Sequence, residues 1–284
     1  MDSKQIHHTI ASTYDLLAQK YERAVTPVYR PLAKRLLQYI DLRPGWTVLD
    51  AGTGTGLVAL LGAVRVGKTG KMIGVDASEQ MLAFARAKAA QFGFTQCDFR
   101  VGDLHALEFP DACFDVALSE FALHYTDIEK SLQELHRVLQ PRGALVLHLW
   151  AAESSAPHKA MWDALAPFRA NEATGMLAAL RAQAEKSYAF RQAYGAPDTL
   201  RGAVEQAGFA NVEAYAESHP TKVVSVDAFL EIASASPALN AEISALTDES
   251  REKYLRDVRT LLKKFETTNG FEWMFNTIAV VAKK

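Results

Sequence analysis

The stretch that decides the fold is VLDAGTGTG, residues 48–56. A short apolar run ends at Asp50 and passes at once into a turn with glycines at positions 52, 54 and 56, after which residues 57–66 continue as an apolar helical segment. Glycine lets the backbone turn sharply, and it lets backbone N–H groups approach a ligand with no Cβ in the way. The stretch therefore predicts a buried strand, a ligand-binding loop and a helix, in that order.

The same alternation continues along the chain. Further apolar segments at 71–76, 98–101, 114–119 and 144–150 alternate with segments of helical periodicity, such as residues 128–139. Apolar strands that alternate with helices indicate a mostly parallel sheet covered on both faces. Because crossovers between parallel strands are right-handed, we expect a doubly wound α/β sheet.

The segments around this core read differently. Residues 151–198 are rich in alanine and predict two or three helices without a strand, while helical segments at 226–238 and 247–266 separate two late strands at 211–216 and 272–282. Insertions on the ligand side of such sheets often cover the substrate, so we expect a lid, with extra packing as the alternative. The expected organisation is an N-terminal helical cover (1–45), a ligand-binding core (46–150), a helical insertion (151–199) and a C-terminal completion of the core with a further helical insertion (200–284).

Composition excludes several classes of function. A formal net charge of −2 over 284 residues gives no electrostatic reason to expect a nucleic-acid partner. No other potential zinc ligand lies at the usual spacing from Cys97 or Cys113, so no metal site is predicted. The longest apolar stretch, residues 143–152, is too short to cross a bilayer, and the N-terminus has no signal-peptide pattern. We expect a cytoplasmic protein without membrane insertion, and nothing in the sequence indicates its oligomeric state.

Three acidic residues end the first three expected strands, at Asp50, Asp76 and Asp103. Ligands of open parallel sheets bind outside the carboxyl ends of the strands, so these acids are expected to lie close together. A carboxylate at Asp76 can accept both hydroxyls of a ribose, and one at Asp103 can accept from an exocyclic amine such as adenine N6. Each acid could instead cap a helix or end a loop, but that reading does not account for all three.

The spacing of the glycines separates two kinds of nucleotide ligand. A dinucleotide fingerprint, G-x-G-x-x-G, needs a third glycine where Leu57 stands, and no Gly-Lys-Ser/Thr follows to make a P-loop. Asp50, two residues before Gly52, would repel a pyrophosphate but attract an ammonium or sulfonium group. The loop therefore favours S-adenosylmethionine (SAM) over NAD.

These motifs together resemble the class I SAM-dependent methyltransferases. The resemblance lies closest to the subgroup that includes the ubiquinone/menaquinone C-methyltransferases and many natural-product methyltransferases. It covers about residues 10–150, more loosely the chain from Ala207, and departs from the family at Arg142, where a glycine is usual. It implies a Rossmann-like fold with a mostly parallel sheet of seven strands. The motifs that carry it are residues 48–56, 75–82, 102–104, 109–116 and 134–143.

The resemblance also implies roles for individual residues toward SAM. Asp50 and Gly52 would contact the methionine end, Asp76 the ribose and Asp103 the adenine N6, and Ser119 would lie under the sulfonium. The full set of expected cofactor contacts is Tyr14, Tyr21, Asp50, Ala51, Gly52, Thr53, Gly54, Gly56, Asp76, Ala77, Met81, Gly102, Asp103, Leu104 and Ser119.

Other members of this set would enclose the cofactor. Ala77 and Met81 would pack on the adenine, with Leu104 beside the ring. In the N-terminal helical segment, Tyr14 and Tyr21 occupy positions that in the family often close over the cofactor.

Methyl transfer itself needs alignment and a dry site, with a base only where the nucleophile must lose a proton. His124 and His148 follow or end strands that face the expected methyl group, so both are candidate bases. A hydrogen-bonded core position is the alternative for His148. Tyr125 and Trp150 are candidates for the acceptor pocket.

The acceptor is expected to be a small, partly hydrophobic molecule. Its specificity should lie in residues 1–30, 151–200 and 220–270, which carry no recognisable motif, so O-, N- and C-methylation all stay open. The expected product of the cofactor is S-adenosylhomocysteine (SAH). The alternatives are a non-catalytic SAM-binding protein or an NAD-dependent oxidoreductase.

Overall fold

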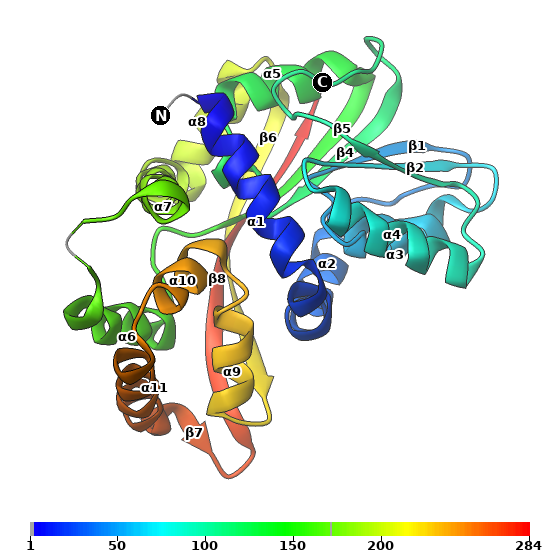
Figure 1. Ribbon diagram of the computed structural model, residues 1–284. Helices are drawn as coiled ribbons and strands as arrows, with labels where there is room; N and C mark the ends of the chain where they lie inside the picture. The colour runs from blue at the N-terminus through cyan, green and yellow to red at the C-terminus, as the bar shows by residue number, and fades with distance from the viewer. Residues whose placement is uncertain (1–2, 171) are drawn as a thin grey trace.

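The computed structural model describes residues 3–170 and 172–284, and its strands form one sheet in the order β3-β2-β1-β4-β5-β8-β6 (Figure 1). β1 to β5 are parallel, and β8 lies antiparallel between β5 and β6. The chain winds outward in both directions from β1, which confirms the doubly wound α/β class; a two-residue β7 adds an eighth strand. The strands are β1 (Thr47–Ala51), β2 (Lys71–Asp76), β3 (Cys97–Val101), β4 (Phe114–Glu120), β5 (Leu139–Trp150), β6 (Ala210–Val223), β7 (Glu266–Thr267) and β8 (Gly270–Lys283).

Helices cover both faces of the sheet. α2, α3 and α4 pack on one face, while α5 and α8 pack on the other. Each group of helices buries its own apolar cluster against the sheet. The helices are α1 (Ser3–Ala24), α2 (Thr26–Leu36), α3 (Leu57–Val66), α4 (Glu79–Phe92), α5 (Ile128–Val138), α6 (Ala156–Leu165), α7 (Gly175–Tyr194), α8 (Pro197–Gln206), α9 (Val226–Ala233), α10 (Pro237–Ser244) and α11 (Asp248–Leu262), with 3-10 turns η1 (Leu123–Tyr125), η2 (Ala166–Phe168) and η3 (Lys263–Phe265).

Local sequence signals fix the helix ends near the ligand side of the sheet. Ser78 caps α4 by accepting a hydrogen bond from the Met81 N–H, and Gly93 ends this helix in the left-handed conformation. Asp127 caps α5 in the same way as Ser78 caps α4. These caps fix the first residues of α4 and α5 at the ligand side of the sheet.

Two helical predictions need correction. The N-terminal helical segment ends at Leu36 rather than near residue 45, because Arg65 donates to the carbonyl groups of Leu37 and Ile40 and holds them in a turn. The helix expected over 226–238 is two helices, α9 and α10, since Pro237 begins the second one.

Residues 141–143, just before the strand expected over 144–150, form an irregularity inside β5. The strand starts at Leu139, and its register against β4 shifts between Leu139 and Ala144. Arg142 takes a left-handed conformation there, with φ of 68°. Glycine suits such a backbone best, which accounts for the glycine that is usual in the family, and nothing in the structure explains the arginine.

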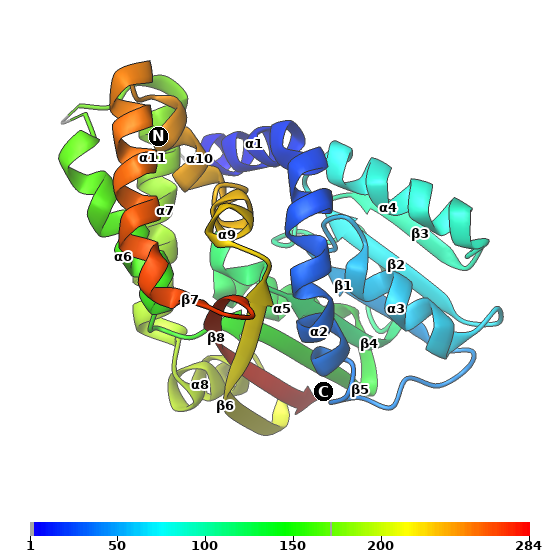
Figure 2. The ribbon, with the colours of Figure 1, turned by 90° about the horizontal axis from the view of Figure 1, so that it is seen from below.

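The last two long strands extend beyond the rest of the sheet. β8 pairs with β5 only over residues 277–283, whereas residues 271–276 pair with β6, and Phe271 also pairs with Glu266 of β7. This two-stranded extension carries α6, α9 and α11, which share a second apolar core around Phe229, Tyr254 and Phe271 (Figure 2). The helices after β5 and those between β6 and β8 thus form one layer beside the main sheet.

Candidate functional site

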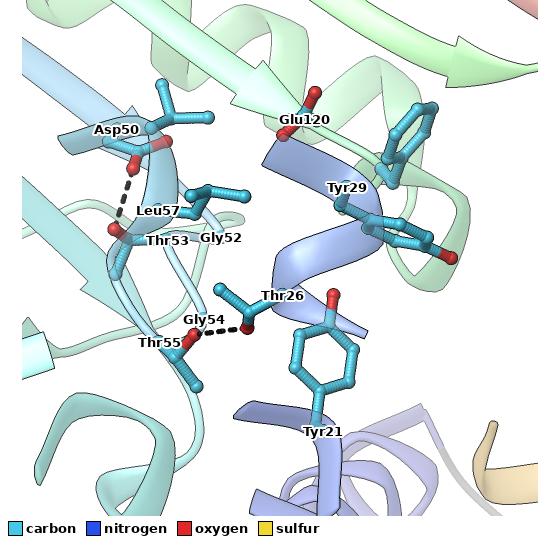
Figure 3. Close-up of a pocket in the computed structure, with 12 residues that line it drawn as sticks. Tyr21, Thr26, Tyr29, Asp50, Gly52, Thr53, Gly54, Thr55, Leu57 and Glu120 are labelled. Carbon is cyan, nitrogen blue, oxygen red and sulfur yellow. Dashed lines mark hydrogen bonds between the residues drawn. The ribbon is translucent and has the colours of Figure 1, made fainter. Parts of the chain in front are cut away.

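A pocket lies at the carboxyl ends of β1 and β4, under the first two helices. Figure 3 shows the loop after β1 on one side and Tyr21, Tyr29 and Glu120 on the other. The lining residues are Tyr21, Thr26, Tyr29, Asp50, Gly52, Thr53, Gly54, Thr55, Leu57, Val58, Glu120 and Phe121. Five of the residues expected to contact SAM therefore line the pocket: Tyr21, Asp50, Gly52, Thr53 and Gly54.

The loop after β1 is held in shape by backbone hydrogen bonds and by close packing. The N–H groups of Gly52 and Thr53 both donate to the carbonyl of Val75 on β2, at 2.8 and 3.0 Å. Gly52 has φ of +76°, and a Cβ on it would lie 2.1 Å from the Cβ of Ala122. Gly56 begins α3 with φ of +82° and packs closely on Ala85. Only glycine fits at these two positions.

Asp50 lies at the base of the pocket and is almost fully buried, with 1% of its surface exposed. Its Oδ2 accepts hydrogen bonds from Thr53 Oγ1 at 2.7 Å and from the Ala59 N–H at 3.0 Å. Burial raises the pKa of this carboxyl group from its ordinary 3.8 to about 7, despite these hydrogen bonds. A cationic ligand group beside it would favour the charged form.

Asp76, at the end of β2, joins the loop to the start of α4. Its Oδ2 accepts from the Gly54 N–H at 2.8 Å and its Oδ1 from the Ser78 N–H at 3.0 Å. Burial raises its pKa. Each carboxylate oxygen keeps a second lone pair for a ligand hydroxyl. Beside it, Ala77 is exposed and Met81 is buried.

Asp103 follows β3 and is positioned by a histidine. Its Oδ1 accepts from the His105 backbone N–H and lies 2.9 Å from His105 Nδ1. The Nε2 of that imidazole accepts from the Asp127 N–H at 2.8 Å, so the proton of a neutral ring is on Nδ1. The Asp103 side chain is 59% exposed and therefore open to a ligand. Leu104, next to it, is buried close to Gly52.

The first two helices close the pocket from above. The Tyr14 hydroxyl donates to the Tyr125 hydroxyl at 2.9 Å, and its ring meets the Tyr21 ring edge-to-face at 6.1 Å. Thr26 Oγ1 at the start of α2 lies 3.1 Å from Thr55 Oγ1 of the loop. Asp15 Oδ1 accepts from Ser78 Oγ and from the backbone N–H of residue 80 at the start of α4.

Two other expected contacts lie in or directly after a strand: Ser119 in β4 and Gly102 after β3. Ser119 is fully buried, and its hydroxyl donates to the Ala51 carbonyl at 2.8 Å, which ties β4 to β1 beneath the loop. Gly102 leaves room for Val75, since a Cβ there would lie 2.8 Å from that side chain. These residues shape the site through the sheet rather than through free side-chain groups.

The two candidate bases lie outside the pocket lining. His124 sits in η1, and its Nδ1 is buried with no hydrogen-bond partner among the described residues. Burial lowers the pKa of His124 to about 3. His148 is fully buried on β5, and burial lowers its pKa to about 3 as well. Both imidazoles are neutral at physiological pH.

Sequence reasoning missed several residues of the site. Thr26, Tyr29, Glu120 and Phe121 line the pocket, and Asp15 anchors α1 beside it. Glu120 directly follows the expected strand at 114–119, and an acid at a strand end was the signal that identified Asp50, Asp76 and Asp103. The other four depend on how α1 and α2 fold over the sheet, which no local pattern reveals.

Comparisons with known proteins agree with this arrangement. A family model described as a methyltransferase domain matches residues 42–189. The chain is 32% identical over 222 residues to nocamycin O-methyltransferase of Saccharothrix syringae, covering 76% of this chain and 78% of the relative. It is 30% identical over 213 residues to the ubiquinone/menaquinone biosynthesis C-methyltransferase UbiE of Escherichia fergusonii, covering 74% and 83%.

A solved structure shares the fold at low sequence identity. It is phosphoethanolamine N-methyltransferase 2 of Haemonchus contortus, in complex with phosphomonomethylethanolamine and SAH. Its TM-score is 0.58 at 16% identity, covering 98% of this chain and 60% of that one. Within the described residues, no helix has both the length and the apolar character needed to cross a membrane.

Proposed function

Because this chain belongs to the class I SAM-dependent methyltransferases, we propose that it transfers the methyl group of SAM to a hydroxyl of a small, partly hydrophobic acceptor. The chain is a methyltransferase enzyme whose cofactor is SAM and whose cofactor product is SAH. The observation that carries the proposal is the pocket, in which the glycine-rich loop and Asp50 face an aromatic wall with one carboxyl group, that of Glu120.

The cofactor fits the polar wall by its charges and hydrogen-bonding groups. The methionine ammonium would lie beside Asp50, whose burial already makes a neighbouring positive charge favourable. The ribose hydroxyls would donate to Asp76, and the adenine N6 to the exposed carboxylate of Asp103. Tyr14 and Tyr21 would then hold α1 over the bound molecule.

The opposite wall suits an apolar acceptor with a hydroxyl group. Tyr29 makes edge-to-face contacts at 5.6 Å with both Phe121 and Phe275, and Phe121 stacks on Trp150 at 3.8 Å. Aromatic faces bury a flat, apolar molecule well. Within this wall Glu120 lies in the pocket lining, where it can orient an acceptor hydroxyl by a hydrogen bond.

Alignment and exclusion of water are the main catalytic contributions of this pocket. The sulfonium already activates the methyl carbon, so the enzyme must hold the nucleophile in line and keep the site dry. His124 and His148 stay predictions as bases, and their place outside the lining favours Glu120 as the group that meets the acceptor. An O-methyltransferase among the relatives supports oxygen as the acceptor atom.

The two helical insertions would form the acceptor lid. A second hollow lies among Lys20 of α1, Met161 of α6 and Leu230 of α9, and α10 and α11 complete it. These helices come from the three sequence regions expected to set acceptor specificity. We propose that the part of the acceptor remote from the methyl group reaches this layer.

The cofactor site is tested by SAM titration of Asp76→Ala. Loss of hydrogen bonds to a charged group should weaken binding by about 1.5–3 kcal/mol, or roughly ten- to a hundredfold. Isothermal calorimetry measures this, with Asp41→Ala as the matched control because that carboxylate is exposed far from the pocket. An unchanged affinity in Asp76→Ala would place the ribose elsewhere.

The acceptor is tested separately, with SAM labelled in its methyl group and a panel of small phenols, enols and alcohols. Label on oxygen supports the proposal, whereas label on carbon or nitrogen contradicts the choice of acceptor atom. Bound SAH without turnover on any panel member would favour a SAM-binding protein that does not catalyse.

A further inference from the structure

A row of polar side chains crosses the apolar sheet, on the face covered by α2. Glu120 on β4 pairs in register with His148 on β5, and Glu217 on β6 pairs with Thr277 on β8. His219, two residues after Glu217, points to the same face. Polar groups inside a sheet cost free energy unless they find partners, so this row needs a physical reason.

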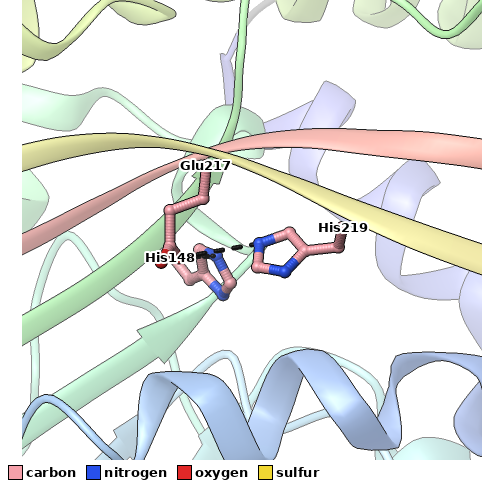
Figure 4. A group of neighbouring side chains, drawn as sticks. All are labelled: His148, Glu217 and His219. Atoms are coloured by element: carbon pink, nitrogen blue, oxygen red, sulfur yellow. Dashed lines mark ion pairs between the residues drawn. The ribbon is translucent and has the colours of Figure 1, made fainter.

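Three of these side chains, those of His148, Glu217 and His219, converge on one point, as Figure 4 shows. Glu217 Oε2 lies 3.7 Å from His148 Nε2 and 3.6 Å from His219 Nε2, and one ligand atom of each of the three residues lies within 4.8 Å of the others. Thr277 Oγ1 is 2.8 and 3.0 Å from the same two nitrogens. Tetrahedral zinc, with bonds of about 2.0–2.2 Å, places its ligand atoms about 3.3–3.5 Å apart. The four atoms therefore outline a cage of suitable size.

Hydrogen bonds alone do not satisfy this cluster. Glu217 Oε2 is buried and accepts no hydrogen bond from the described residues, although it faces two imidazole rings. The Thr277 hydroxyl can donate to one Nε2 atom and accept from the N–H of the other, so the unsatisfied group at the centre is the Glu217 carboxylate oxygen. A divalent cation at the centre would satisfy the carboxylate oxygen and both nitrogens at once.

The groups behind the cluster hold its members in the orientation that a metal needs. Glu217 Oε1 accepts from Arg35 Nε and from the Tyr39 hydroxyl, both at 2.7 Å, which leaves Oε2 turned toward the rings. His148 Nδ1 lies 3.5 Å from Glu120 Oε1. A carboxylate behind the second nitrogen of an imidazole is the usual support of a metal-ligating histidine.

We propose that His148, Glu217 and His219 bind one divalent transition-metal ion, with zinc as the best fit and the Thr277 hydroxyl or a water as fourth ligand. Two imidazoles and one carboxylate suit zinc and cobalt, whereas calcium and magnesium prefer oxygen ligands throughout. The ion would fasten β5 to the β6–β8 extension and fix Glu120 in the pocket wall. The ligands come from strands far apart in the chain, which is why no spacing in the sequence indicates the site.

Cobalt(II) is the probe that tests the site, added to protein without an affinity tag. We expect one equivalent to bind and to give the strong visible absorption of a tetrahedral cobalt centre, which zinc then removes. His219→Ala should lower the affinity at least about a hundredfold, since even supporting residues of metal sites contribute ten- to a hundredfold. His136→Ala is the matched control, because that half-buried histidine lies on the opposite face of the sheet.

Glu217→Gln keeps the volume of the side chain and provides a second variant should His219→Ala fail to fold. Zinc should also raise the Tm of the unmodified chain but not that of either variant. The proposal is overturned if cobalt binds with less than one equivalent, or if a folded variant binds it as well as the unmodified chain does. None of these readouts depends on SAM or on methyl transfer, so the proposed function stands or fails separately.

Discussion

At the scale of single residues, Gly52 is the position where the loop tolerates least change. A Cβ at this residue would lie 2.1 Å from the Cβ of Ala122, and φ is +76°. Gly52→Ala must therefore displace the loop or the start of η1. We expect SAM affinity to fall more than about tenfold, together with a loss of stability, because both a clash and a left-handed alanine are introduced.

Gly54→Ala is the control for that prediction. Gly54 also has positive φ, at +53°, but a Cβ there meets nothing within 4 Å. In the free protein the variant carries only the cost of a left-handed residue, about 1–2 kcal/mol. Calorimetric titration with SAM and urea unfolding of both variants compare the two effects. Equal losses of affinity would show that contact with Ala122 is not the reason for the glycine.

Asp50 predicts a pH dependence of cofactor binding. Burial raises its pKa to about 7, and a bound ammonium group favours the carboxylate, so binding releases a proton below that pH. We expect SAM affinity to fall as the pH is lowered from 8 to 6, by up to about tenfold per unit below the pKa. Calorimetry in two buffers of different ionisation enthalpy measures the released proton. Asp50→Asn should lose this slope; an equal slope in the variant would contradict the assignment.

The same shift affects the stability of the protein without its cofactor. The folded pKa of Asp50 lies above its ordinary 3.8, so the folded state holds an extra proton between these values. The contribution to the unfolding free energy is fully present below about pH 4 and is lost as the pH rises to about 7. Charge on Asp50 is thus unfavourable in the free protein and favourable beside a cation.

Much of the candidate cofactor site was predictable at this scale. Asp50, Asp76 and Asp103 lie at or just beyond the carboxyl ends of β1, β2 and β3, and parallel strands bring such positions to one edge. Thr26 and Asp15 could not be predicted, because their partners in the loop and in α4 are reached only through the packing of α1 and α2. Their local sequence resembles that of any exposed helix face.

At the scale of elements, one buried carboxylate joins the two helical insertions. Glu242 of α10 has 3% of its side chain exposed and accepts from Arg181 of α7 at 2.7 Å and from Arg169, just after η2, at 2.9 Å. Glu242→Ala would leave two guanidinium groups without their partner. We expect a loss of roughly 2–4 kcal/mol, slightly below the usual cost of breaking a buried ion pair, because Arg169 is partly exposed.

Urea unfolding, followed by tryptophan fluorescence, measures this loss. Glu252→Ala is the matched control, since the Glu252 side chain is 75% exposed in a surface pair. A change in Glu242→Ala no larger than that of the control would mean that the two insertions hold together without the ion pair.

The observed ends of helices and strands agree with the predicted ends where a strong local sequence signal marks them. Residues 57–66 and 71–76 form α3 and β2 as expected, since glycines or an acid border both segments. β6 runs seven residues beyond the strand expected over 211–216, to Val223, because β8 supplies backbone partners for polar residues that show no strand pattern. The length of such a strand is set by its pairing with a segment distant in the chain. A short stretch of sequence does not contain that information.

At the scale of the whole molecule, two apolar cores share one pair of strands. The main core lies on both faces of the sheet, and the second lies between the extension of β6 and β8 and the helices α6, α9 and α11. Phe121 belongs to the second core and also lines the pocket. Any rearrangement of these three helices therefore reaches the aromatic wall directly.

The place of β8 in the sheet bears on how the protein is made. This strand follows every other element in the chain, yet it lies between β5 and β6 and supplies backbone partners to both. On the ribosome the N-terminal part of a chain can begin to fold first, so β5 would present an unpaired edge until β8 emerges. The nascent chain is thus most exposed to aggregation, and most in need of a chaperone, during synthesis of residues 151–269.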